Sequence, residues 1–171
     1  MPGHATSASE QEGTAMLTTL NQLTGLPVIW HGGVVGQVER GVMDAQAHCL
    51  AGLIVRHGLR SAKWIPLQQI SLLGRYCVVT DRRPVRLPTT LPPVTSRVYL
   101  TNGSLAGWVT DALLCRETQS VEALEISESL LGRLMGQRRY AAVYQVEQGK
   151  AVIPELLSWA EFRRRYEEEK E

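Results

Sequence analysis

Short apolar runs separated by glycine dominate the chain from Leu23 onward, and within these runs apolar and polar residues alternate. A period of two is typical of half-buried β-strands, and a sustained period of 3.6 residues first appears near the end of the chain. Pro66 is expected at a strand end or on an edge strand, because proline cannot donate to a sheet ladder. The pattern of the first half predicts strands over 26–30, 34–44, 48–56, 62–70 and 75–80.

The same pattern returns after a proline-rich stretch. Residues 84–96 contain four prolines, which disfavour a helix or a central strand and predict an extended linker. From residue 97 the order of strand, turn and long alternating strand recurs, with an Asn-Gly turn at 102–103. An internal duplication is the simplest account. A shift of 71 residues, with a later gap of about four, matches Gly36 with Gly107, Leu53 with Leu124, Val55 with Ile126, Gly74 with Gly149 and Val78 with Ile153.

The last segment, 155–171, has a different period. Leu156, Trp159, Phe162 and Tyr166 are spaced at helical intervals and form one apolar stripe. Pro154 is suited to the first turn of such a helix. We therefore predict an amphipathic helix that covers an open side of the second β unit or pairs with a partner chain.

These elements predict an all-β protein with two tandem β units and a C-terminal α-helix. The two units should pack together, because a unit of about 60 residues buries only a small core by itself. The first residues are small and polar, which is typical of a disordered tail. The predicted divisions are the tail 1–22, the first β unit 23–83, the linker 84–96, the second β unit 97–154 and the helix 155–171.

The composition and the cysteines bear on the compartment in which the protein is expected to fold. The chain has 171 residues, of which 44% are hydrophobic and 20% charged, so it can bury a core. Neither a signal peptide nor an apolar run long enough to span a bilayer is visible in the sequence. The three cysteines are widely spaced and form no CxxC motif, which favours a reduced, cytoplasmic protein over a disulfide framework.

The net charge of +1 hides an excess of basic residues in the first half. Arg56, Arg60 and Lys63 fall within eight residues, in a loop between two predicted strands. They either serve as solubilising surface charges or form a site for an acidic protein or a phosphate backbone. Arg82, Arg83 and Arg86 would extend this patch if the linker folds back. The candidate partner-binding residues are Arg56, Arg60, Lys63, Trp159, Phe162 and Tyr166.

The sequence contains no recognisable catalytic or metal-binding motif, so we predict no catalytic residues, no cofactor and no metal. Nucleotide-binding glycine motifs and a GxSxG elbow are missing. His48 and Cys49 are adjacent and would point to opposite faces of a strand, and neither His31 nor His57 lies at a usual ligand spacing. Asp44 and Asp111 are each explained by turn capping. The tryptophans are expected in the core or at a domain interface.

Residues 23–83 resemble the PRC-barrel domain, and 97–154 resemble it more loosely. The resemblance rests on the opening Leu23, Gly25, Pro27 and Val28, on the Gly36 and Val38 pair, and on the closing Val78 and Val79. Further matches are Asp44, Gly52, Leu53, Val55, Ile65, Pro66 and Ile70. The second copy has Cys115 where the first has Asp44, and it lacks an early Ile-Pro.

This resemblance implies that the two β units are two tandem small β-barrels, which act as docking modules and have no catalytic residues. Members of this family resemble the cytoplasmic part of a photosynthetic reaction-centre subunit and the C-terminal domain of a ribosome-maturation factor. We therefore expect a non-enzymatic intracellular adaptor that acts through protein–protein contacts and is open to homo-oligomerisation. The alternative is an RNA-associated or ribosome-assembly factor that uses the basic first barrel.

Overall fold

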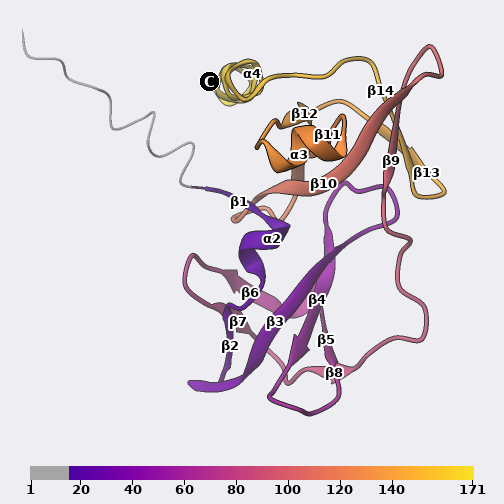
Figure 1. Ribbon diagram of the computed structural model, residues 1–171. Coiled ribbons are helices and arrows are strands. Elements are labelled where there is room, and N and C mark those ends of the chain that lie inside the picture. The colour runs from indigo at the N-terminus through magenta and orange to yellow at the C-terminus, as the bar shows by residue number, and fades with distance from the viewer. Residues whose placement is uncertain (1–15) are drawn as a thin grey trace, which may run out of the picture.

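Two curled β-sheets, one after the other along the chain, form the molecule (Figure 1). The computed structural model describes residues 16–171. Each sheet has seven strands, so the all-β, two-barrel fold class predicted from the sequence is confirmed. We call the unit built on the first sheet unit 1 and the unit built on the second sheet unit 2. No helix in the described part of the chain is long and apolar enough to span a bilayer.

Unit 1 has the strand order β6-β7-β2-β3-β4-β5-β8. All neighbours are antiparallel except β2 and β7, which are parallel. As predicted, Pro66 stands at the end of its strand, where a missing N–H costs nothing. The elements are β2 (Pro27–Trp30), β3 (Gly33–Met43), β4 (Leu50–Arg56), β5 (Lys63–Pro66), η1 (Leu67–Gln69), β6 (Ile70–Leu73), β7 (Val78–Thr80) and β8 (Val85–Arg86).

Unit 2 has the order β12-β11-β10-β9-β14-β13, and β1 from the N-terminal region pairs with β10. Again one neighbouring pair, β9 and β14, is parallel. The strands are β1 (Leu17–Thr19), β9 (Arg97–Leu100), β10 (Leu105–Cys115), β11 (Val121–Ser127), β12 (Arg139–Ala141), β13 (Gln145–Glu147) and β14 (Lys150–Ile153). The helices are α2 (Leu20–Leu23), α3 (Leu130–Leu134) and α4 (Trp159–Glu168).

The two units share one register at their central hairpins, which supports the duplication. In β3 and β4, Val38 faces Val55, and in β10 and β11 Val109 faces Ile126. All six cross-strand pairs of the first hairpin recur in the second at a shift of 71 residues, and both irregularities of register recur with them. Each hairpin also has a positive-φ glycine at the equivalent place, Gly36 and Gly107. The predicted shift is therefore confirmed over these strands.

The predicted match of Val78 with Ile153 is wrong. Val28 of β2, the cross-strand partner of Gly36, pairs in parallel with Val78, whereas Val98 of β9, the cross-strand partner of Gly107, pairs in parallel with Ala151. The loops and turns that precede β7 and β14 differ in length, so a single gap does not align both ends of the repeat.

The contact between the units is itself symmetric. The N–H of Leu50 donates to the carbonyl oxygen of Gln119 at 3.0 Å, and that of Val121 donates to His48 at 2.9 Å. The two donors, Leu50 and Val121, are 71 residues apart, and so are the two acceptors, His48 and Gln119. Cys49 and Ser120, also equivalent, form the bridge between these two bonds. The repeats therefore meet through an approximate two-fold arrangement, as in an isologous dimer interface.

Tyr144 adds a side-chain bond across this contact. Its hydroxyl group donates to the carbonyl oxygen of Ala47 at 2.6 Å, and its ring lies 6.3 Å from that of His48. Burial raises the pKa of Tyr144, so the phenol stays protonated and remains a donor at neutral pH.

Replacing Tyr144 by phenylalanine is expected to lower the free energy of unfolding by about 1 kcal/mol, because one partly buried hydrogen bond is lost with little change in volume. Urea denaturation of both proteins measures the difference. A Tyr76→Phe variant is the control, since Tyr76 is exposed in the β6–β7 turn of unit 1. Equal stabilities of the Tyr144 and Tyr76 variants would contradict the contribution assigned to this bond.

The predicted tail 1–22 is too long. Residues 1–15 lie outside the described residues, but 17–22 form β1 and most of α2. β1 pairs with β10 of unit 2, and Leu23 at the end of α2 is buried in the core of unit 1. Leu20 packs against the cores of both units. The segment was missed because three strand residues and one helical turn are too short to show a period.

The predicted linker 84–96 is not wholly free of the first barrel. β8 pairs with β5, with Lys63 opposite Arg86 and Trp64 opposite Val85. Leu87 and Leu91 then pack on the cluster around Trp64. Apolar residues between the prolines therefore hold the segment against unit 1.

The C-terminal helix α4 starts at Trp159 and not at Pro154. Ser158 caps it: its hydroxyl oxygen accepts from the N–H of Glu161 at 3.3 Å, and the Glu161 carboxylate accepts from the N–H of Ser158 at 2.7 Å. This reciprocal capping box sets the start of the helix. The helix docks on unit 2, with Phe162 and Tyr166 buried beside Leu113, Ala123, Tyr140 and Leu157.

Candidate functional site

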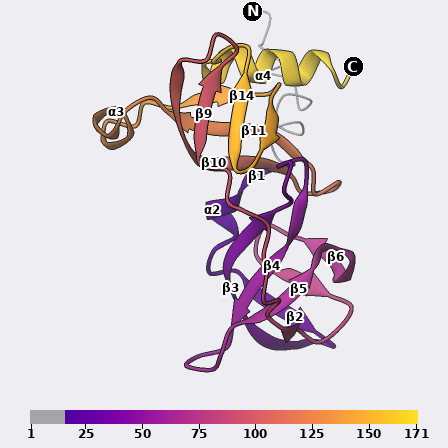
Figure 2. The same ribbon diagram turned by 90° about the vertical axis from the view of Figure 1, so that its right-hand side faces the viewer.

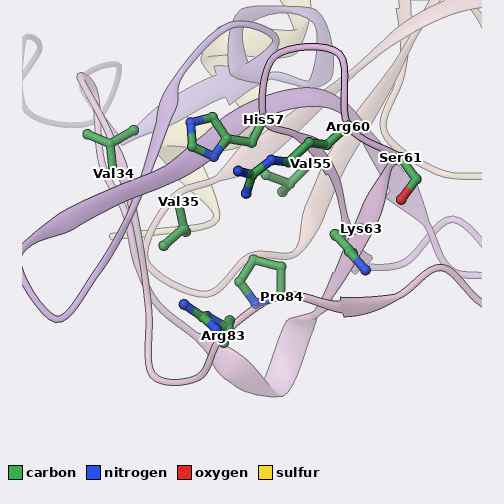
Figure 3. Close-up of a pocket in the computed structure, with 9 residues that line it drawn as sticks. All are labelled: Val34, Val35, Val55, His57, Arg60, Ser61, Lys63, Arg83 and Pro84. Atoms are coloured by element: carbon green, nitrogen blue, oxygen red, sulfur yellow. The ribbon is translucent and has the colours of Figure 1, made fainter.

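A pocket of about 420 Å³ opens on unit 1, and its walls carry most of the predicted basic patch (Figure 3). The start of β3 and the end of β4 supply three valines, and the loop from β4 to β5 supplies His57 and Arg60. Arg83 and Pro84, just before β8, form the opposite side. The lining residues are Val34, Val35, Val55, His57, Arg60, Ser61, Lys63, Arg83 and Pro84.

The pocket is positively charged. Arg60, Lys63 and Arg83 line it, and all three are exposed to solvent. None of the nine lining residues carries a carboxylate. The three cations therefore act together on whatever enters, and the valines give the same pocket an apolar wall.

Local contacts hold the β4–β5 loop over the pocket. The N–H of Arg60 donates to the carbonyl oxygen of His57 at 3.2 Å, which closes a turn through Gly58. Gly58 has a φ of +59°, a conformation that glycine adopts without strain. The guanidinium of Arg56 donates to the carbonyl oxygen of Arg60 at 3.0 Å from the strand side. The Arg60 side chain is thus presented by a fixed loop.

Arg83 reaches the pocket because the chain turns back before β8. Its guanidinium lies 5.2 Å from the centre of the Trp30 ring, at a distance typical of a cation–π contact. Trp30 in turn stacks on His31, with ring centres 4.3 Å apart. The pairing of β8 with β5 then places Arg86 opposite Lys63. The sequence predicted that Arg83 would extend the basic patch if the linker folds back. The chain does fold back here, and Arg83 lies on the same pocket as Arg60 and Lys63.

The structure divides the predicted patch. Arg60 and Lys63 line the pocket, whereas Arg56 does not. Arg56 forms an ion pair with Glu39 across the hairpin, at 3.1 Å, and is expected to be locally neutralised. The sequence could not show this, because Glu39 is 17 residues away and faces Arg56 only in the β3–β4 hairpin.

The predicted aromatic candidates lie on unit 2 and play different parts. Phe162 and Tyr166 are buried in the unit, so they are core residues and not surfaces for a partner. Trp159 remains 38% exposed, with its ring centre 5.3 Å from that of Tyr140 and 5.7 Å from that of Phe162.

The histidine and cysteine candidates do not converge on a metal site. Asp44 accepts from the N–H of His48 at 2.8 Å and from the thiol of Cys49 at 3.4 Å. Burial, together with this carboxylate, raises the pKa of the Cys49 thiol. Asp44 thus caps a turn, as predicted. Within residues 16–171, no three His, Cys, Asp or Glu side chains gather in a way that would hold a metal ion.

Asp111 does not cap a turn, contrary to the prediction. It lies in the middle of β10 and accepts from the N–H of Asn21 at 3.2 Å, which fastens α2 to unit 2. Its cross-strand neighbour is Glu125, which is buried and lies 3.6 Å from the guanidinium of Arg138. Asp111 and Glu125 line a polar cavity of about 460 Å³ beside α2. Sequence reasoning missed this cavity because α2 itself was not predicted.

No protein-family model matches the chain, and no curated protein matches its sequence significantly.

Proposed function

We propose that the protein is a non-enzymatic adaptor whose unit 1 binds an acidic segment of a partner protein. The observation that carries the proposal is the pocket with Arg60, Lys63 and Arg83 on its walls and no carboxylate among its lining residues. A carboxylate-bearing peptide would pair with these cations while its apolar side chains contact the three valines.

The residues that line the pocket favour a peptide over RNA. Single-stranded nucleic acid is usually held by a groove that follows the backbone and by aromatic side chains that stack on bases. The lining of this pocket contains valines and a proline, and His57 is its single ring of aromatic character. RNA association remains the alternative and is one outcome of the test below.

The proposal extends to the family and the compartment. The repeated hairpin with its glycine at positive φ supports membership of both units in the PRC-barrel family, whose members act as docking modules. All three cysteines are free thiols, which supports a location in the reducing cytoplasm.

The test uses two labelled probes, a polyglutamate peptide and a polyuridine RNA, with binding followed by fluorescence anisotropy. The variant Arg60→Glu/Lys63→Glu/Arg83→Glu should weaken peptide binding by about tenfold or more, since this corresponds to about 1.4 kcal/mol shared by three contacts. Binding of the native chain should also fall as salt is raised.

The matched control is Arg75→Glu/Arg97→Glu/Arg164→Glu, in which the three exposed arginines lie away from the pocket. It changes the net charge by the same amount and should leave peptide binding within about twofold of the native value. Equal losses of peptide binding in the pocket variant and the control variant would show that the peptide is attracted by the net charge of the protein and not by the pocket. RNA binding that depends on the pocket, with no peptide binding, would replace the adaptor proposal by the alternative.

A further inference from the structure

Helix α3 on unit 2 exposes an unusual number of apolar side chains. Leu130, Leu131, Leu134 and Met135 are 78%, 67%, 85% and 68% exposed. We call these four residues the apolar tip. Figure 2 shows α3 standing away from the strands of unit 2, at the far side from α4. Contiguous exposed apolar groups of this kind mark a contact surface.

The apolar tip is one face of an ordered turn of helix. At 100° per residue, the four side chains span an arc of about 140°, and Arg133 points away from that arc. Ser129 caps the helix, because its hydroxyl oxygen accepts from the N–H of Gly132 at 2.9 Å. The N–H of Gln137 donates to the carbonyl oxygen of Gly132 at 2.8 Å and closes the far end.

The internal repeat shows that the tip is an addition to the barrel. In unit 1 the connection from β4 to β5 is 57–62, and in unit 2 the equivalent connection from β11 to β12 is 128–138. The strands that flank the two connections keep equivalent register, with Val55 opposite Lys63 and Ile126 opposite Arg139. Unit 1 closes its sheet without such a helix, so the tip is not needed to build the core.

Basic residues surround the apolar tip. Arg133, Arg138 and Arg139 lie in the same connection or at its end, and Arg138 lies 3.6 Å from the buried carboxylate of Glu125 on β11. Glu128 is 3.6 Å from the guanidinium of Arg139. Trp108 is partly exposed and lines, together with Leu130 and Arg133, a cavity of about 400 Å³ beneath the helix. Exposed leucines beside a tryptophan and an arginine are typical of a peptide that enters the interface of an anionic membrane.

We propose that the apolar tip inserts into the surface of a bilayer that contains anionic lipids. The apolar side chains cover one face of a helix that projects from the protein, so an occupant has to surround the helix. The acyl chains of a bilayer can surround it without a preformed groove. Arg138 and Arg139 are paired with Glu125 and Glu128, so Arg133 is the arginine placed to attract the negative headgroups near the surface. This contact is independent of the basic pocket on unit 1.

The test is co-sedimentation of the full chain with vesicles of phosphatidylcholine, alone or mixed with phosphatidylglycerol. The native chain should sediment with the mixed vesicles, and its tryptophan emission should shift to shorter wavelength, a shift that Trp108→Phe should reduce. Leu130→Ser/Leu134→Ser should reduce the partition coefficient by about tenfold or more, because two apolar side chains are withdrawn from the bilayer. Arg133→Gln should remove most of the preference for phosphatidylglycerol.

The matched control is Leu59→Ser/Leu72→Ser, which changes two exposed leucines of unit 1. It should sediment as the native chain does. The proposal is overturned if the native chain does not bind mixed vesicles, or if both leucine variants lose binding equally. A dimer in light scattering that Leu130→Ser/Leu134→Ser dissociates, without vesicle binding, would identify a second copy as the occupant. The same variant should still bind polyglutamate, which separates this result from the proposed adaptor function.

Discussion

Replacing Gly107 by alanine is expected to lower the free energy of unfolding by about 3 kcal/mol. The residue has a φ of +153°, and an added Cβ would lie 2.3 Å from the carbonyl oxygen of Ser127 on β11. That oxygen belongs to the backbone, so the strands themselves would have to separate. Backbone strain and overpacking each cost roughly 1–3 kcal/mol. Urea denaturation followed by circular dichroism measures the change.

Two further glycines test this explanation. Gly36 is the equivalent residue in unit 1, where an added Cβ would lie 2.9 Å from the carbonyl oxygen of Arg56, so Gly36→Ala should be destabilising as well. Gly33→Ala is the control, because it lies on the same strand and the nearest atom to its Cβ is 3.7 Å away. A loss at Gly33 as large as that at Gly107 would attribute the effect to strand glycine in general and not to close approach.

Replacing Phe162 by alanine should lower the free energy of unfolding by about 3–5 kcal/mol, as large-to-small changes of buried aromatics do. Phe162 is 1% exposed, and its ring contacts Tyr140, Trp159 and Tyr166 with centres 5.7–5.8 Å apart. The substitution leaves a cavity between α4 and the sheet. Thermal unfolding followed by circular dichroism measures the loss.

The control for Phe162 is Leu134→Ala, which shortens an exposed apolar side chain and should change stability by no more than about 0.5 kcal/mol. A chain that ends at Pro154 should show the same dependence on α4, with lower solubility or a larger mass in solution, because Leu113 and Tyr140 lose their cover. A truncated chain with native stability and mass would contradict the role given to α4.

The sequence by itself determined the β-strands and their duplication. Alternation of apolar and polar residues is a local property, and it predicted the hairpins that carry the shared register. Gly36 and Gly107 were matched by sequence alone because a close approach of two strands leaves room for no other residue. The apolar stripe of the last segment likewise predicted α4, although the capping box at Ser158, and not Pro154, sets its start.

Two of the three residues of the predicted basic patch lie together on one pocket, and their role in binding a partner stays a prediction. Arg60 and Lys63 line the pocket because a loop between strands projects from a barrel. Arg83 reaches the pocket because β8 pairs with β5. Arg56 does not line the pocket and forms an ion pair with Glu39 instead. Both outcomes depend on which strands become neighbours.

Tertiary structure alone decided the features that join distant parts of the chain. β1 and α2 are too short to be stable by themselves, and they form because β10 pairs with one and both cores accept Leu20 of the other. The symmetric contact around Cys49 and Ser120 likewise needs both folded hairpins before its hydrogen bonds can form. Periodicity records which face of an element is buried, but it carries no information about which other element buries it.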